Sequence, residues 1–164
     1  MSKKVPHQAF AIEYNGVVPQ LETKVGIVSA FDKTKTMEIK AVWDTGATHS
    51  VITPRVFTSL GLFPIDTTMV TGVNSQKEVP VTMVDIILPN RVRVPGWRVT
   101  VCDVGGCDML IGMDIIHNGD FSIANGDGKT TFSFAIPPFE NKTNLVDKAT
   151  RTNEKNKKYF NRPF

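Results

Sequence analysis

The chain of 164 residues has few side chains of the kind that bind metal ions or form disulfide bonds. It contains two cysteines and three histidines. Cys102 and Cys107 are separated by a short segment with two glycines, a spacing that matches no zinc-binding or redox motif. His7, His49 and His117 are scattered and form no cluster with them. The sequence therefore predicts ordinary free cysteines and no metal site.

Long hydrophobic runs are also absent. No segment approaches the roughly 20 consecutive apolar residues that are needed to cross a bilayer. The N-terminal segment from Met1 to Gln8 is followed by no apolar region of the kind found in secretory signal peptides. We therefore expect a cytoplasmic protein with no membrane partner.

Excess positive charge is missing from most of the chain and is concentrated at its C-terminal end. The whole chain carries 19 Lys and Arg against 16 Asp and Glu, a formal charge of +3. Residues 141–164 hold seven of the cations and two of the acids, or +5, so residues 1–140 carry −2. Because the end also has few large apolar residues, we expect a domain over 1–140 and a basic, disordered tail over 141–164. A solvated tail is favoured over weak contact with nucleic acid or acidic partners, so a nucleic-acid partner is not expected.

The length and the residue pattern predict a single all-β domain. At 41% hydrophobic residues, the chain can bury one ordinary core. Short helices are expected from Thr53 to Leu60, with Thr53 as cap and Gly61 as stop, and from Gly112 to His117. Alternating or β-branched runs bounded by turn residues predict strands at 8–14, 24–30, 37–42, 67–73, 79–88, 98–102, 121–124 and 130–134.

The segment Asn125-Gly126-Asp127-Gly128 has the composition of a β-hairpin turn, since these residues tolerate the positive φ that such turns require. The following Lys129 and Thr130 imitate the end of a phosphate-binding loop. That motif needs a glycine six positions before the lysine, where this chain has Ile123. A hairpin turn is therefore expected.

A polar turn after one predicted strand holds the main candidate for catalysis. Val42-Trp43 leads into Asp44-Thr45-Gly46-Ala47-Thr48, and the tripeptide Asp-Thr-Gly occurs once in the chain. An Asp in such a turn is also a common structural feature, stabilised by its own backbone amides. A second segment, Asp108 to Ile116, lies 64 positions downstream of Asp44 and contains Leu110-Ile111-Gly112.

Together the two segments resemble the catalytic loop and the hydrophobic-hydrophobic-Gly element of the retropepsin-like aspartic proteases. The resemblance spans roughly Ala41 to Phe134 and is nearest in character to the single-domain members of bacteria and of ubiquitin-shuttle proteins. It implies a closed acid-protease β-barrel with short helices, active as a homodimer. In the family, Leu110, Ile111 and Gly112 pack beneath the catalytic loop, and Gly112 permits close approach of the backbone.

The resemblance also implies a mechanism that one chain cannot complete. The sequence has no second Asp-Thr-Gly or Asp-Ser-Gly and is too short for a two-lobed enzyme. Asp44 and its symmetry mate would form the catalytic pair on a two-fold axis. Carboxyls about 3 Å apart share a proton, as in aspartic proteases generally, so one activates water while the other polarises the scissile carbonyl. We expect an endopeptidase that acts on peptides or proteins and needs no cofactor.

Three neighbours of Asp44 have implied supporting roles. Thr45 bonds across the dimer axis in the family, and Gly46 brings backbone N–H groups near the carboxyl oxygens. Ala47 stands where pepsin-like enzymes usually carry a hydroxyl residue, so the pair should stay half-protonated to higher pH. We expect an optimum in mildly acidic buffer, which a maximum below about pH 3.5 would contradict.

A hairpin between the two motifs has the position of the flap that closes over substrate in the family. Its arms are expected at Thr67–Val73 and Lys77–Val81, with Asn74-Ser75-Gln76 at the tip. A surface hairpin with no lid role is the alternative. The candidate substrate contacts are Thr48, Met69, Gly72 and Val73.

Other residues near the motifs have simpler expected roles. His49 is predicted to be an exposed loop residue, Trp43 a packing residue, and Asp114 a residue of the helix start or of an interface. In retroviral enzymes an acid or amide near this position joins a network with an Arg, which the sequence does not identify here. Thr131 to Phe134 alternates as a strand does, either across a dimer interface or within one chain.

Two alternatives to an active protease remain. One is a catalytically weak or inactive retropepsin-like module for dimerisation or peptide binding. The intact Asp-Thr-Gly disfavours it, because a pair of like charges costs stability that a pure binder has no reason to lose. The other is a monomer whose catalytic pair never assembles, and sedimentation would distinguish it.

Overall fold

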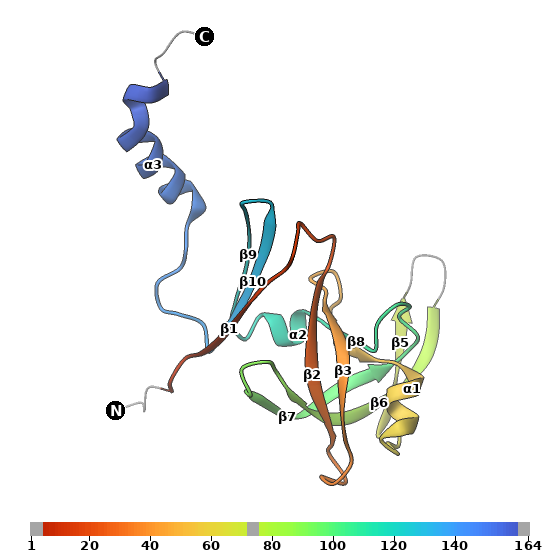
Figure 1. Cartoon of the computed structure of the whole chain (residues 1–164). Coiled ribbons are helices and arrows are strands. Elements are labelled where there is room, and N and C mark those ends of the chain that lie inside the picture. The colour runs from red at the N-terminus through yellow and green to blue at the C-terminus, as the bar shows by residue number, and fades with distance from the viewer. Residues whose placement is uncertain (1–4, 72–75, 161–164) are drawn as a thin grey trace.

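The computed structural model describes residues 5–71 and 76–160. The described part is mainly β-strand with a few helices (Figure 1). In chain order its elements are β1 (Gln8–Glu13), β2 (Leu21–Ser29), β3 (Thr36–Trp43), β4 (Val51–Ile52), α1 (Pro54–Ser59), β5 (Asp66–Thr71), β6 (Gln76–Ile87), β7 (Arg93–Val101), β8 (Met109–Ile111), α2 (Met113–Ile116), β9 (Asp120–Gly126), β10 (Lys129–Ile136) and α3 (Leu145–Phe160).

The larger of two sheets closes into a barrel. Its seven strands run in the order β2-β3-β8-β4-β7-β6-β5, and an additional pairing of β2 with β6 closes six of them into a ring. In that closing pair, Gly26–Ser29 of β2 lie antiparallel to Val84–Ile87 of β6. β5 pairs with β6 outside the ring and forms the outer arm of a hairpin. The predicted all-β class and closed barrel are confirmed.

The period-2 alternation of the strands fills the barrel interior. In β2, Val25 and Ile27 are 1% and 0% exposed, whereas Lys24 between Thr23 and Val25 is exposed. Met109 and Ile111 of β8 are completely buried. Because each apolar side chain of this size gains about 1.5–3 kcal/mol on full burial, alternation fixes which face of each strand turns inward.

A smaller sheet covers one side of the barrel core. It has the order β1-β10-β9, and both pairings are antiparallel. Trp43 of β3 is 4% exposed, and its indole N–H donates to the Thr23 hydroxyl at 3.0 Å. Trp43 is therefore a packing residue, as predicted. Its ring joins a cluster with centroid separations of 4.9–6.3 Å formed by Phe10, Trp43, Phe121, Phe132 and Phe134.

The predicted hairpin turn joins β9 to β10. Gly126 pairs with Lys129, so Asp127 and Gly128 form a two-residue loop with φ of 51° and 72°. Two positive φ values are what a type I′ hairpin turn requires. β10 lies between β1 and β9, and Phe132 and Phe134 are buried, so the alternation in this strand serves pairing within one chain.

The helix α1 begins and ends where the sequence predicts, but its cap differs. Thr53 occupies the N-cap position, yet its side chain donates or accepts no capping hydrogen bond and its buried hydroxyl has no partner among the described atoms. Pro54 at the first helical position supplies no N–H, which lowers the need for a cap. Gly61 has φ +55°, the left-handed conformation expected of a helix stop.

The C-terminal segment departs from the expected disordered tail, because residues 145–160 form helix α3. The helix stands apart from the barrel at the end of an extended segment (Figure 1). The Asn144 side chain accepts the Val146 N–H at 2.9 Å and so caps its first turn. Lys, Arg, Glu and Ala favour helix formation even without a hydrophobic core. Reasoning from composition alone therefore underestimated the helix propensity of this segment.

A buried carboxylate lies at the opposite end of β3 from Asp44. Asp85 of β6 is 1% exposed and lies at an irregularity in the pairing with β7. It accepts hydrogen bonds from Lys33 at 2.8 Å, from the Gly96 N–H at 2.8 Å, and from Arg93. Burial alone would raise the pKa of Asp85, but these three donors together lower it to about 2.

Candidate active site

Asp44 lies where β3 ends. Its N–H donates to the Ile111 carbonyl oxygen at 2.9 Å, which extends the pairing of β3 with β8 by one residue. The turn then reverses so that Gly46 donates its N–H to Asp44 Oδ1 at 2.8 Å. Ala47 donates to the Asp44 carbonyl oxygen at 3.2 Å. The carboxyl group is thus half-buried and oriented by the backbone of its own turn.

The rest of the turn is open to solvent in the single chain. Thr45, Gly46, Thr48 and His49 are exposed, and Ala47 is half-buried. His49 is the exposed loop residue that the sequence predicts. Because the turn joins β3 to β4, which both pair with β8, its exposed residues are held in place mainly by backbone contacts.

The second motif lies directly beneath this turn. β8 pairs in parallel with β3, so that Trp43 lies opposite Ile111, and antiparallel with β4, so that Ile52 lies opposite Met109. The chain therefore leaves β3 through Asp44 and returns on the far side of β8. Ile111 is completely buried and Leu110 half-buried.

Gly112 is the point of closest approach between the two motifs. A Cβ at this position would lie 2.7 Å from the His49 carbonyl carbon and 2.8 Å from the Ala47 carbonyl oxygen, closer than side-chain atoms approach backbone. This close approach allows two backbone hydrogen bonds. The Met113 N–H donates to the Ala47 carbonyl oxygen at 2.8 Å, and the Asp114 N–H donates to the Thr48 carbonyl oxygen at 3.2 Å. Backbone bonds thus hold the catalytic-loop candidate from below.

Asp114 connects this turn to β7. Its carboxylate accepts the Ser50 N–H at 3.0 Å, the Ser50 hydroxyl at 2.7 Å and the Trp97 indole N–H at 2.9 Å. Ser50 is completely buried, and its hydroxyl oxygen accepts the Gly112 N–H at 3.1 Å. The sequence predicts that Asp114 belongs to the helix start or to an interface, but it identifies neither Ser50 nor Trp97 as a partner. No Arg contacts it among the described residues, so the network known from retroviral enzymes is not reproduced within the chain.

The loop after Asp44 and the base of the hairpin line one hollow of about 160 Å³. Arg98 donates to Asp66 at 2.7 Å across it, and this bond, with the Thr67 N–H, lowers the pKa of Asp66. The complete lining consists of His49, Asp66, Thr67, Thr68, Val81, Arg98, Val99 and Thr100. His49 and Arg98 were not among the substrate contacts predicted from the sequence.

The predicted flap is described in its two arms. Asp66–Thr71 pair with Gln76–Val81, so Gln76 belongs to β6 rather than to the tip. Met69 is 58% exposed on β5 and available for contact. Gly72 and Val73 lie outside the described residues, as do Asn74 and Ser75. Neither Thr48 nor Met69 lines the hollow described above.

Within the described residues, no three His, Cys, Asp or Glu side chains gather as metal ligands do. Cys102 and Cys107 are half-buried free thiols, and burial raises the pKa of Cys107. No helix in the described part of the chain has both the length and the apolar character to span a membrane.

Comparison with known proteins supports the likeness seen in the motifs. Residues 33–118 match the family model described as "gag-polyprotein putative aspartyl protease", which covers both motifs and the hairpin between them. A search of curated proteins found no match.

Among solved structures, a retropepsin-like aspartic protease from Rickettsia conorii superposes with a TM-score of 0.53 at 14% identity, covering 81% of this chain and 97% of the other. The EIAV protease in complex with the inhibitor HBY-793 gives 0.47 at 26% identity, with coverage of 63% and 90%. The retroviral protease-like domain of Ddi1 from Leishmania major gives 0.43 at 18% identity, with coverage of 66% and 91%. The first of these supports the fold. With the family match over more than half of its residues, the chain belongs to the retropepsin-like aspartic protease family.

Proposed function

We propose that the protein is an aspartic endopeptidase whose active site forms between two copies of the chain, each contributing Asp44. The observation that supports this most strongly is the state of the Asp44 carboxyl. It is half-exposed on an open turn and accepts a single hydrogen bond, from Gly46, among the described residues. A carboxyl with unused hydrogen-bonding capacity at a fixed position is suited to meet a second carboxyl and a water molecule.

The chemistry follows from two such groups sharing one proton. The ionised carboxylate removes a proton from water as the water oxygen attacks the scissile carbonyl carbon. The protonated carboxyl donates a hydrogen bond and then its proton to the carbonyl oxygen, giving a tetrahedral diol. Transfer of a proton to the amide nitrogen breaks the C–N bond and releases an amine and a carboxylic acid. These steps of peptide hydrolysis require no cofactor.

Two exposed features support assembly of a homodimer. Thr45 lies beside Asp44 on the exposed turn and can bond to the matching turn of a second copy. β9 pairs with β10 along one edge, and its other edge has no partner among the described strands. Its residue Ile123 is 51% exposed. Because free strand edges are templates for pairing, we propose that β9 contributes to the dimer contact.

Substrate would lie between this turn and the β5–β6 hairpin. Met69 is exposed on the β5 arm, and Thr48 is exposed on the turn. The hollow lined by His49 and Arg98 lies between the same two elements and would accept a side chain of the peptide. Closure of the hairpin would exclude water from the reacting bond.

The proposal is tested by cleavage of an unbiased peptide library between about pH 4 and 7. Wild type is compared with Asp44→Asn and with Asp103→Asn, which removes an exposed carboxylate far along the chain from the turn. We expect cleavage by wild type and by Asp103→Asn, and none by Asp44→Asn. A dimer in sedimentation that cleaves nothing would favour the peptide-binding module, and a chain that stays monomeric would reject the mechanism.

A further inference from the structure

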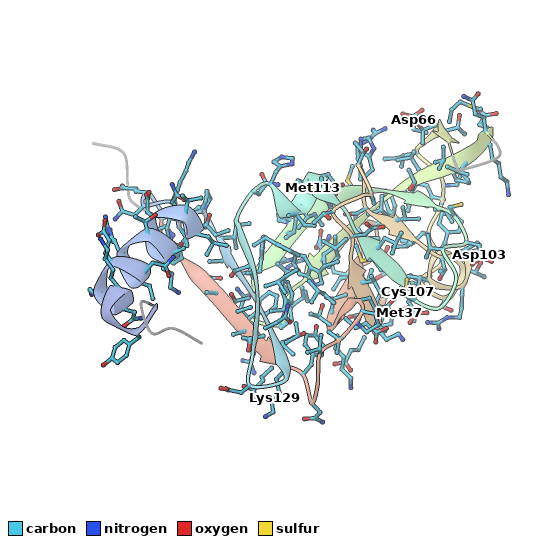
Figure 2. The ribbon with its side chains drawn as sticks, turned by 90° about the horizontal axis from the view of Figure 1, so that it is seen from above. Met37, Asp66, Asp103, Cys107, Met113 and Lys129 are labelled. Atoms are coloured by element: carbon cyan, nitrogen blue, oxygen red, sulfur yellow. The ribbon has the colours of Figure 1, made fainter. Side chains whose placement is uncertain are left out.

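Positive charge gathers along one face of helix α3 and the short segment before it. Lys142, Lys148, Arg151 and Lys155 line a single hollow of about 400 Å³, together with Asn144, Asp147 and Thr152. One acidic residue thus stands among four cations. Figure 2 shows the side chains of this helix extending into open space, separate from those of the barrel.

The spacing of these cations explains why they converge. Arg151 lies three positions after Lys148, and Lys155 lies seven positions after it. This spacing places all three side chains on one side of the helix. At about 1.5 Å of rise per residue, Lys148 and Lys155 are separated by roughly 10 Å along the axis. The face therefore presents a row of charges rather than one point.

The four cations of this hollow differ from several cations elsewhere in the chain, which form salt bridges. Lys24 of β2, Lys40 of β3 and Lys129 of β10 form salt bridges with glutamates at 3.2, 3.1 and 2.7 Å. The salt bridges among the described residues involve none of Lys142, Lys148, Arg151 and Lys155. Residues 1–140 carry −2 overall, so the excess positive charge of the chain lies in residues 141–164.

We propose that this face of α3 binds the phosphate backbone of nucleic acid without sequence preference. A nucleic acid presents negative charges in a dense regular row, and cations that neutralise them release condensed counterions. The sequence alone favours a solvated tail, but it does not show that α3 and the segment before it place four cations around one hollow. The proposal is independent of whether Asp44 is catalytic.

Two other classes of partner fit the helix less well. A membrane surface requires a continuous apolar face, whereas Asn153 and Asn156 interrupt the side that begins with Leu145 and Ala149. A protein partner usually needs an apolar anchor at the centre of the contact, and the cationic face has none.

The test uses the full chain and a labelled mixed-sequence DNA duplex, with binding followed by fluorescence anisotropy at two salt concentrations. For four phosphate contacts, the slope of log K against log salt should be about −3.6, and affinity should fall about 150-fold between 50 and 200 mM salt. The variant Lys148→Gln/Arg151→Gln/Lys155→Gln should lose most of the binding and most of this slope. The control Lys24→Gln/Lys40→Gln/Lys129→Gln changes the net charge equally and should bind as wild type does.

Three results would overturn the proposal. The first is no binding by wild type at 50 mM salt, and the second is an equal loss in both triple variants. The third is preference for vesicles containing anionic lipid, or for polyglutamate of matched charge, over the duplex. Circular dichroism of the variants shows whether α3 persists, so that loss of charge is distinguished from loss of the helix.

Discussion

Asp44 and Asp85 lie at opposite ends of β3, and they differ in burial and in their charged partners. Asp85 is 1% exposed and is bonded by Lys33, Arg93 and the Gly96 N–H. Asp44 is half-exposed and is bonded by the N–H of Gly46. One carboxylate is fully satisfied by its own chain, and the other is left with free acceptor capacity.

The difference separates a structural carboxylate from a candidate for chemistry. A buried charge is tolerated only when partners compensate for its lost hydration, so Asp85 stabilises the fold by tying the β2–β3 turn to β6 and β7. A group that must accept a proton and bind water needs open positions, which Asp44 has. Stability and activity should therefore respond oppositely to the same substitution at the two sites.

The largest expected effect is loss of activity in Asp44→Asn. An amide cannot remove a proton from water, so kcat/KM should fall by at least about 1000-fold. The free energy of unfolding should change by less than about 0.5 kcal/mol, because an Asn oxygen can still accept the Gly46 N–H. Peptide cleavage and urea unfolding of the same preparation measure the two effects. Marked destabilisation would assign Asp44 the structural role instead.

The converse substitution, Asp85→Asn, should destabilise the protein by about 3 kcal/mol while leaving kcat/KM of the folded enzyme within a factor of about 2. The cost lies at the low end for a buried ion pair because Lys33 and Arg93 are each about half-exposed and can be hydrated. Urea unfolding with Asp103→Asn as control measures it. An unchanged midpoint would show that the network at Asp85 contributes nothing to stability.

The same residue predicts a pH dependence of stability. The pKa of Asp85 is lowered to about 2 in the fold, from an ordinary value near 3.8 in the unfolded chain. Its contribution is thus present above pH 3.8 and is lost as the pH falls towards 2. This shift in the pKa corresponds to about 2 kcal/mol in the free energy of unfolding. When unfolding is measured across this pH range, wild type should lose stability that Asp85→Asn does not lose. Parallel plots of stability against pH for the two proteins would refute the assignment.

Substitution of Asp114 should affect both stability and activity, unlike substitution of Asp44 or Asp85. Its carboxylate accepts bonds from Ser50 and Trp97 and holds the turn that carries Asp44. Asp114→Asn replaces one acceptor oxygen with a donor, which should cost about 1–2 kcal/mol and lower kcat more than it raises KM. Steady-state kinetics alongside unfolding tests this. A purely structural role predicts lost stability with kcat unchanged in the folded fraction.

The sequence predicts the residues of the candidate site better than it predicts the residues that hold them in place. Asp44, Gly46 and Gly112 follow from local motifs, and the structure brings them together. Ser50 and Trp97 could not be found this way, because their contacts with Asp114 join segments distant in the chain. Asp85 did leave a signal, since an acid within the apolar run Val84 to Ile87 needs a buried partner.

Short elements were also beyond prediction from periodicity. β4 has two residues and β8 has three, too few to show alternation, yet β8 between β3 and β4 positions the catalytic-loop candidate. β7 begins at Arg93, whereas the predicted strand begins at Arg98; Pro95 and Gly96 in between are residues that disfavour strands. Tertiary pairing overrides local strand preferences at these positions.

The central claim is that each chain supplies half of one active site, and mixing chains tests it most directly. Wild type and Asp44→Asn are combined in equal amounts, allowed to exchange subunits, and assayed at constant total chain concentration. If both carboxyls are required, the activity should fall to about one quarter of that of wild type, because only that share of random pairs holds two intact chains. An activity of about one half would show that each chain works alone and would contradict the account.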